Sequence, residues 1–314
     1  MTEGFAYMDQ EKKNSKKNGA NPRLMLIGSR GQLGSDCREI FSPSFEVESF
    51  NSDDLDLTSP DEVYAAVLAC RPEVIINCAA HTRVDDCETE SEKAYLINAE
   101  SPARLAAAAK RCGALLVQVS TDYVFAGDRE ITQGYVEGDA VAPVSIYGRS
   151  KLSGEEAVAG SGCAYLIVRT AWLYGINGHN FLKTMLRLAL ADPGLERKVV
   201  ADQFGCLTWS WSLAQQLLSL VKSGKRGLYH GVGEGSASWF QVAARFLELM
   251  EVEHRLVPCT TAEYPTPARR PANSILLNQR LKDDGLLLMR PWQEDLELFV
   301  SRYRDRLLQE ASMM

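Results

Sequence analysis

The chain has 314 residues, enough for one large domain or for a domain with an added lobe. Hydrophobic residues make up 46% of it and charged residues 24%, and no apolar run approaches the ~20 residues of a membrane span, which predicts a soluble globular protein. A net charge of −7 argues against broad binding to nucleic acid or to an anionic membrane.

Cysteine usage and the first residues indicate a cytoplasmic protein. The eight cysteines form no C-x-x-C pair, and several lie inside apolar runs, which predicts buried reduced thiols. The four histidines lack the spacing of metal ligands. Residues 1–22 are polar, carry four lysines and lack the apolar segment of a secretory signal, so we expect a disordered tail.

A glycine loop follows the first predicted strand. Residues 24–27 are a short apolar run, typical of a strand buried on both faces. The run passes into a G-x-x-G-x-x-G loop with Gly28, Gly31 and Gly34, and then into a helical stretch. Such glycines allow a tight turn and a close approach of the backbone to a pyrophosphate, which the helix N-terminus then faces. The pattern predicts a dinucleotide site.

The second predicted strand, residues 45–50, indicates which dinucleotide is bound. An NAD site usually carries an acid near the end of this strand, for the ribose 2′-hydroxyl, but Asn51 stands here. Arg30, inside the glycine loop, is able to pair with a 2′-phosphate. Together they predict that NADPH is accepted, with NADH as the alternative cofactor. The other interpretation of Arg30 is a solvated loop residue.

Strands and helices then alternate along the chain. Ser59 and Pro60 are typical of an N-cap and a first helical position, and strands are expected at 74–77, 115–119 and 164–168, with a helix at 94–109. After the strand at 74–77, small residues such as Ala80 let the chain pass close to a flat ligand. His81 and Thr82 follow at the carboxyl end of that strand, where open α/β sheets bind ligands.

The alternation becomes less regular after residue 175. Helices are expected at 181–190, 212–222 and 238–250, and a strand at 227–232. Prolines exclude regular helix from 264–271, and Arg269 and Arg270 in that loop suit a diphosphate. We therefore predict an α/β fold: a Rossmann-like doubly wound parallel sheet at 23–175, to which later segments return, and a smaller mixed α/β C-terminal lobe, mainly substrate-binding, at 176–314.

Tyr147 and Lys151 are the candidate catalytic pair. Side chains four residues apart on a helix share one face, and an ammonium beside a phenol lowers the phenol pKa from about 10. The pair is a candidate general acid, although Y-x-x-x-K alone occurs by chance in many helices. The catalytic interpretation of the pair is favoured because the pair follows a phosphate loop and a strand that ends in Ser120 and Thr121.

In these motifs the chain resembles the extended short-chain dehydrogenases, and within them the dTDP-4-dehydrorhamnose reductases. The matching segments cover nearly all of the chain after residue 22, and S-T-D-Y-V-F at 120–125 with P-T-P-A-R-R-P at 265–271 are the most specific. The other matching segments are 28–34, 54–56, 77–82, 147–155, 169–174, 202–205 and 238–239.

The resemblance implies NAD(P)H-dependent reduction of the 4-keto group of dTDP-4-dehydro-6-deoxy-L-mannose to dTDP-L-rhamnose. It implies that Thr121, Tyr147 and Lys151 are catalytic, that Lys151 also holds the nicotinamide ribose, and that Trp172 packs against the sugar. The implied cofactor-binding residues are Gly28, Arg30, Gly31, Gln32, Leu33, Gly34, Asn51, Asp56, Leu57, Ala80, His81, Thr82, Tyr147 and Lys151. The implied substrate-binding residues are Thr121, Asp122, Tyr147, Trp172, Arg269 and Arg270.

The chain also departs from the family pattern. Leu207 stands where the family usually has proline, and Asn51 replaces the common acid. Some relatives form dimers bridged by Mg²⁺ through carboxylates, but Glu294 and Glu297 cannot be matched to those ligands, so we expect no assignable metal and a monomer or a homodimer.

Three alternatives stay open. A related sugar-nucleotide dehydratase would carry Asp-Glu after the threonine, but Tyr123 follows Asp122 here. A sugar-nucleotide epimerase is a similar alternative. A non-catalytic NADP-binding regulatory subunit, like that of methionine adenosyltransferase, shares this fold but lacks the intact Ser-Thr-Asp triplet.

Overall fold

Six parallel strands form the central sheet of the computed structural model, which describes residues 21–313. The strands are β1 (Arg23–Ile27), β2 (Glu46–Phe50), β3 (Val74–Asn77), β4 (Leu115–Thr121), β5 (Ala164–Thr170) and β10 (Gly227–His230). Their order is β10-β5-β4-β3-β1-β2, so the connections reverse direction between β1 and β3. In sheets of this kind ligands bind beyond the carboxyl ends of the strands at such a reversal. All but the last two residues of the predicted tail, 1–22, lie outside the described residues.

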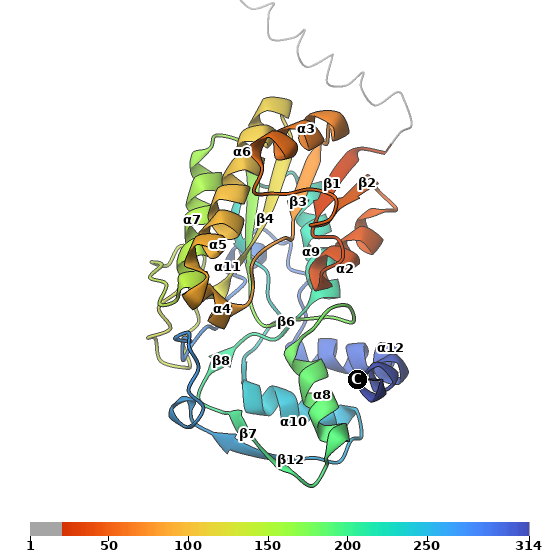
Figure 1. Cartoon of the computed structure of the whole chain (residues 1–314), viewed down its shortest axis with the longest axis vertical. Helices are drawn as coiled ribbons and strands as arrows, with labels where there is room; N and C mark the ends of the chain where they lie inside the picture. Colours follow the sequence, from red (N-terminus) through yellow and green to blue (C-terminus); the bar gives the residue numbers. More distant parts are fainter. Residues whose placement is uncertain (1–20, 314) are drawn as a thin grey trace, which may run out of the picture.

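Helices cover both faces of the sheet (Figure 1). One face carries α2 (Gln32–Phe41) and α9 (Ser210–Ser223), and the other carries α3 (Pro60–Cys70), α6 (Ser101–Cys112) and α7 (Ile146–Gly160). Because side chains alternate along a strand, Leu24 and Leu26 enter the first core while Met25 and Ile27 enter the second. The predicted doubly wound sheet is confirmed.

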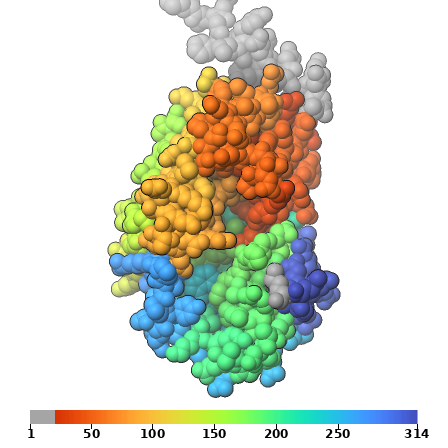
Figure 2. Space-filling view, in the orientation of Figure 1, coloured from red at the N-terminus to blue at the C-terminus, as the bar shows by residue number. Residues whose placement is uncertain are grey.

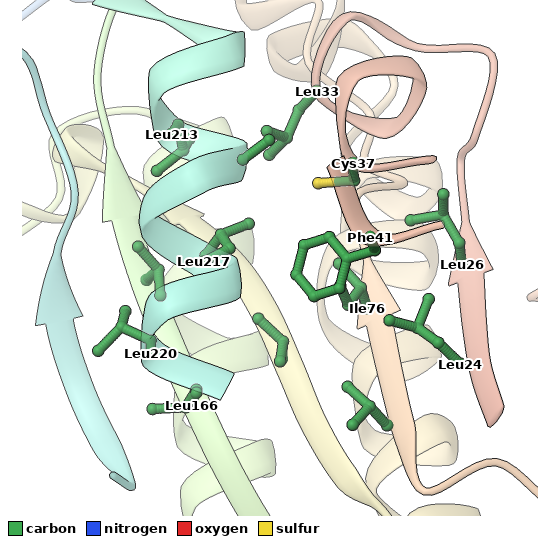
Figure 3. Close-up of a cluster of buried hydrophobic side chains, with 14 of the residues drawn as sticks. Leu24, Leu26, Leu33, Cys37, Phe41, Ile76, Leu166, Leu213, Leu217 and Leu220 are labelled. Atoms are coloured by element: carbon green, nitrogen blue, oxygen red, sulfur yellow. The ribbon is translucent and has the colours of Figure 1, made fainter. Parts of the chain in front are cut away.

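Leucines of α9 bind this helix to the sheet and to α2. Figure 3 shows Leu213, Leu217 and Leu220 pointing from α9 toward Phe41 of α2 and toward strand residues such as Leu166. All five side chains are fully buried. α9 and β10 thus belong to the sheet, although both lie beyond residue 175. The division of the chain into two domains at that residue stays a prediction.

A smaller lobe of helices and short strands lies beside the carboxyl ends of the sheet (Figure 1). Its helices are α8 (Phe181–Ala191), α10 (Trp239–Leu249) and α12 (Trp292–Ser312), and they share a core with Tyr174 and Trp209. Its strand pairs are β7 (Glu196–Val200) with β12 (Arg255–Cys259), β6 (Leu173–Tyr174) with β9 (Thr208–Trp209), and β8 (Phe204–Gly205) with β11 (Ala237–Ser238). Ser238 caps α10 in a capping box, as its position in the sequence predicts.

The helix predicted at 94–109 is divided into three segments. They are α5 (Ser91–Tyr95), a π-helical turn (Leu96–Glu100) and α6. The π turn brings Asn98 inward, where its amide accepts from the His81 backbone N–H at 2.8 Å and donates to Ser150 Oγ of α7 at 3.1 Å. These bonds are non-local, so periodicity alone could not predict the turn.

The remaining helical segments are short, and the thiols are free. The segments are α4 (Val84–Thr89), α11 (Gln279–Asp283) and 3₁₀ turns at Asp122–Val124 and Thr261–Glu263. Six of the eight free cysteines are buried, as expected, whereas Cys112 is exposed. Within residues 21–313 no helix has the length and apolar character that crossing a membrane requires.

Replacing Leu217 by alanine tests the packing of α9. Leu217 is fully buried, so Leu217→Ala should lower the free energy of unfolding by roughly 2–5 kcal/mol. Leu68 on α3 is 48% exposed, so Leu68→Ala makes the same change on a helix surface and should cost less than about 1 kcal/mol. Urea unfolding of both variants measures the difference. Equal losses of unfolding free energy in the two variants would show that the packing of α9 does not depend on the Leu217 side chain.

Candidate active site

A cavity of about 800 Å³ lies where the carboxyl ends of the strands meet the smaller lobe. Its walls come from the glycine loop, the ends of β3, β4 and β5, helix α7, the loop before α8 and the first residue of α10. Figure 2 shows the surface hollowed between the sheet domain, orange to red, and the lobe in green. A cavity of this size fits a dinucleotide or a sugar nucleotide better than a small metabolite.

The glycine loop is packed so closely that side chains do not fit. Gly28 has φ +77°, and a Cβ there would lie 2.9 Å from the Ala79 nitrogen. A Cβ on Gly34 would collide with the carbonyl oxygen of Gly28. Gly28, Gly31 and Gly34 all line the cavity, and α2 begins there without a side-chain cap. The loop therefore offers bare backbone to a ligand, which fits a pyrophosphate.

Asn51 and Arg30 lie together at one end of the cavity. The Asn51 side-chain oxygen accepts from the Arg30 backbone N–H at 2.9 Å and from Ser29 Oγ at 3.2 Å, so this residue holds the loop in shape. The Arg30 guanidinium pairs with Asp53 at 2.6 Å, and both side chains are largely exposed. No local sequence pattern indicates Asp53 as the partner of Arg30.

Helix α7 brings Tyr147 and Lys151 to the cavity wall on one face. Ser145 caps the helix, accepting from the Gly148 N–H at 3.1 Å. A Cβ on Gly148 would collide with the Tyr123 carbonyl, so the glycine allows α7 to lie against the segment after β4. Thr121, at the end of β4, also lines the cavity. The structure thus brings the three predicted catalytic residues together.

The electrostatics of the pair differ from the prediction. Burial raises the pKa of Tyr147 above its usual value, and a hydrogen bond with Thr121 opposes this effect. Burial lowers the pKa of Lys151 to about 8, and the Glu155 carboxylate opposes that effect. Lys151 Nζ donates to the Val119 carbonyl at 2.7 Å. The Tyr147 pKa is therefore raised, whereas the sequence predicted a lower value, because burial is the largest cause of the shift and Lys151 is not among its main causes.

Buried polar groups cluster around Thr121. Its hydroxyl donates to Asp122 Oδ1 at 2.9 Å, and burial raises the pKa of Asp122 to about 6, opposed by the hydroxyls of Ser274 and Thr121. The hydroxyls of Ser120 and Thr170 are buried and have no hydrogen-bond partner among residues 21–313. Buried polar atoms are normally paired, so two unpaired hydroxyls at neighbouring strand ends mark a place for a polar ligand.

Trp172 faces the cavity from the lobe and is held in a strained conformation. Its φ of +44° is rare for a residue with a side chain, and its ring stacks on Trp239 with centroids 3.6 Å apart. A Cβ on Gly205 would collide with the same ring. Strain of this kind concentrates at functional sites.

Three lining residues of the lobe were not singled out from the sequence. Trp239, His179 and Asn180 all face the cavity. Asn180 Nδ2 donates to Gln32 Oε1 of the glycine loop at 3.0 Å and so joins the lobe to the sheet domain. The only local signal was the position of Trp239 inside the matching segment 238–239, at the first turn of a capped helix.

Most predicted site residues line this cavity, and four do not. The residues that line it are Gly28, Arg30, Gly31, Gln32, Leu33, Gly34, Asn51, Ala80, Thr82, Thr121, Asp122, Tyr147, Lys151, Trp172 and Arg270. The four outside it are Asp56, Leu57, His81 and Arg269.

Contacts within the fold account for three of these four residues. Asp56 accepts from the Thr58 hydroxyl at 2.7 Å, and the Leu57 carbonyl accepts from Ser101 at 2.9 Å. His81 Nε2 lies 3.5 Å from the Glu90 carboxylate. Arg269 is exposed, whereas its neighbour Arg270 pairs with Asp85 at 2.7 Å.

Within residues 21–313 no group of three or more His, Cys, Asp or Glu side chains is placed to hold a metal ion. Glu297, one of the two carboxylates considered from the sequence, pairs with Arg245 at 2.6 Å.

Comparison with known proteins gives relatives over nearly the whole chain. A dTDP-4-dehydrorhamnose reductase of Burkholderia thailandensis is 37% identical over 304 residues, which is 91% of this chain and 100% of the relative. The crystal structure of a dTDP-4-dehydrorhamnose reductase from Clostridium acetobutylicum has a TM-score of 0.87 and 40% identity over 90% of this chain and 99% of the other. The Bacillus anthracis enzyme, solved in complex with NADP, gives the same values.

The family model described as "RmlD substrate binding domain" matches residues 22–305, almost all of the described chain. With this match and relatives at 37–40% identity, the chain belongs to the dTDP-4-dehydrorhamnose reductase family.

Proposed function

We propose that this protein reduces the 4-keto group of dTDP-4-dehydro-6-deoxy-L-mannose with NADPH or NADH, which gives dTDP-L-rhamnose in the last step of its synthesis. The observation that carries the proposal is one cavity lined by the glycine loop and by Thr121, Tyr147 and Lys151. Full-length relatives bear the name of this reductase, and the Bacillus anthracis enzyme binds NADP.

The proposed cofactor site uses the sheet end of the cavity. Gly28, Gly31 and Gly34 leave room for the pyrophosphate, and Lys151 is placed to donate to the nicotinamide ribose. When bound, the cofactor supplies the hydride that reduces the keto carbon. The site residues are proposals that rest on position in the cavity and on the family motifs.

In the proposed reaction Tyr147 donates a proton to the sugar oxygen. The phenol is protonated at neutral pH, and burial raises its pKa further, so it gives up the proton only as negative charge develops on that oxygen. Thr121 holds the phenol through a hydrogen bond that opposes the rise in its pKa, and the proposed role of Lys151 is to hold the nicotinamide ribose. Placing all three groups on buried backbone limits their motion and lowers the entropic cost of reaching the reactive geometry.

The proposed substrate site uses the lobe end. The stacked rings of Trp172 and Trp239 offer a flat apolar wall to the deoxysugar, and Asp122 is a buried acceptor beside Thr121. Arg270, with Arg269 next to it, is suited to the diphosphate. We further propose that residues 176–314 form mainly the substrate lobe, that the protein is cytoplasmic, and that it is a monomer or a homodimer.

Adding the keto-sugar nucleotide to protein and NADPH tests the reductase directly. Loss of NADPH absorbance with formation of dTDP-L-rhamnose is the expected result. Cofactor binding without any oxidation would contradict the proposal and favour a non-catalytic binding subunit. A dehydratase or an epimerase would change the sugar without net consumption of NADPH.

Tyr147→Phe isolates the proton donor. The variant keeps the ring that packs edge-on against Tyr123, with centroids 5.4 Å apart, and removes only the phenol oxygen. We expect kcat to fall roughly 10²–10⁴-fold while the Kd of NADPH stays the same. Tyr64→Phe makes the same change on α3, outside the cavity lining, and should leave kcat unchanged. Wild-type turnover in Tyr147→Phe would remove Tyr147 as the acid.

The pH dependence of cofactor binding tests Lys151. Its pKa of about 8 lies below its ordinary value of 10.5, so the ammonium is present below about pH 8 and is lost as the pH rises through that value. If only the charged form donates to the ribose, NADPH affinity should fall about ten-fold from pH 7 to pH 9. Lys151→Met should bind weakly with a flat profile. The same pH profile in Lys151→Met would show that another group titrates.

A further inference from the structure

The ion pair between Arg30 and Asp53 joins the glycine loop to the segment after β2, where a dinucleotide site of this kind holds the ribose 2′-substituent. We propose that Asp53 is a specificity-determining residue, because it competes with a 2′-phosphate for the Arg30 guanidinium and so lets the protein use both NADPH and NADH. This inference rests on the proposed function and names the residue that tunes its cofactor preference.

Arg30 lines the cavity, whereas Asp53 follows the lining residues Asn51 and Ser52 and does not line it. The side chains of Arg30 and Asp53 nevertheless meet at 2.6 Å. The carboxylate therefore acts on the guanidinium and not as a residue of the cavity lining. A guanidinium bound on one side to a carboxylate has fewer donors and less charge to offer a phosphate on the other.

The hydrogen bonds of the Asn51 side chain hold the glycine loop. Among the described residues, no carboxylate lines the cavity beside Asn51 and Arg30. The Asn51 side-chain oxygen accepts from Ser29 and Arg30, and its amide nitrogen donates to Asp54 at 3.2 Å. The charge presented to a ribose 2′-substituent thus depends on Arg30, and through it on Asp53.

The exposure of the pair sets how strong the competition is. The side chain of Arg30 is 67% exposed and that of Asp53 is 71% exposed, so water and salt weaken their attraction. Releasing Arg30 for a 2′-phosphate should therefore weaken NADPH binding only about two- to five-fold. NADH has no 2′-phosphate and leaves the pair intact, so its affinity should not depend on Asp53.

Asp53→Asn tests the inference, because it keeps the shape of the side chain and removes its charge. The Kd values of NADPH and NADH are measured by fluorescence titration of the full-length protein at low salt, without substrate. We expect NADPH to bind about two- to five-fold more tightly and NADH to bind as in the wild type. High salt should remove the gain.

Glu196→Gln is the matched control. Glu196 is an exposed carboxylate that pairs with Arg255 at 3.1 Å in the β7–β12 pair, outside the cavity lining. The variant makes the same change in net charge and should leave both Kd values at the wild-type level. A gain in NADPH affinity there equal to that of Asp53→Asn would reduce the effect to net charge and overturn the inference.

The double variant shows whether Asp53 acts through Arg30. Arg30→Ala alone should weaken NADPH binding and spare NADH. Adding Asp53→Asn to Arg30→Ala should then give no further gain. A gain of the same size in the Arg30→Ala background would mean direct repulsion of the phosphate and would overturn the competition. An unchanged NADPH/NADH ratio in Asp53→Asn would overturn it too.

Failure of the inference and failure of the proposed function give different results. A protein that binds both cofactors with a ratio insensitive to Asp53 keeps its proposed function and loses this inference. A protein that binds neither cofactor contradicts the proposed function itself.

Discussion

The close approach of α7 to its neighbours is the constraint on which the site depends. Gly148 and Gly154 lie where a side chain would collide with the carbonyl oxygens of Tyr123 and Asn98. The first contact sets α7 against the segment that follows β4, and the second sets it against the π-helical turn. Because Tyr147 and Lys151 stand on this helix, both contacts fix their distance from Thr121, and reaction geometry depends on such fixed positions.

This packing has an electrostatic cost that a bound cofactor would offset. Burial disfavours the charged form of Lys151, whose pKa it lowers, and also disfavours ionisation of Tyr147. The Val119 carbonyl and the Glu155 carboxylate support the ammonium only in part. Ribose hydroxyls would give Lys151 further acceptors, so the charged state that its proposed role requires is best supported in the complex with cofactor.

Local sequence patterns predicted the parts of the site that are local. The G-x-x-G-x-x-G pattern identifies the loop without its distant partners, and Ser59 with Pro60 marks a helix start that needs no distant partner. The spacing of Tyr147 and Lys151 places them on one helix face whatever surrounds them. The family motifs then predicted that the glycine loop and the Tyr147–Lys151 pair meet at one edge of the sheet.

The parts that could not be predicted depend on residues far apart in the chain. The stack of Trp172 on Trp239 joins segments 67 positions apart, and the π turn exists because Asn98 bonds to His81 and Ser150. The sign of the pKa shift at Tyr147 was wrong for the same reason, since burial by the whole fold outweighs one neighbouring charge. Residue spacing alone predicts which side chains are neighbours on a helix, but it does not predict how deeply they are buried in the fold.

Hydrogen bonds join the lobe to the residues of the glycine loop and the start of α2, and so link the two halves of the cavity. Asn180 caps α8 through Lys183 and donates to Gln32, while Asn177 donates to Ser35 at 2.9 Å. Both partners lie in the first turn of α2, directly after the glycine loop. A cofactor that orders this turn would therefore also order the loop before α8. Trp172, one of the two stacked rings proposed to face the sugar, lies just before this loop in the chain, so these hydrogen bonds connect the proposed cofactor and substrate ends of the cavity.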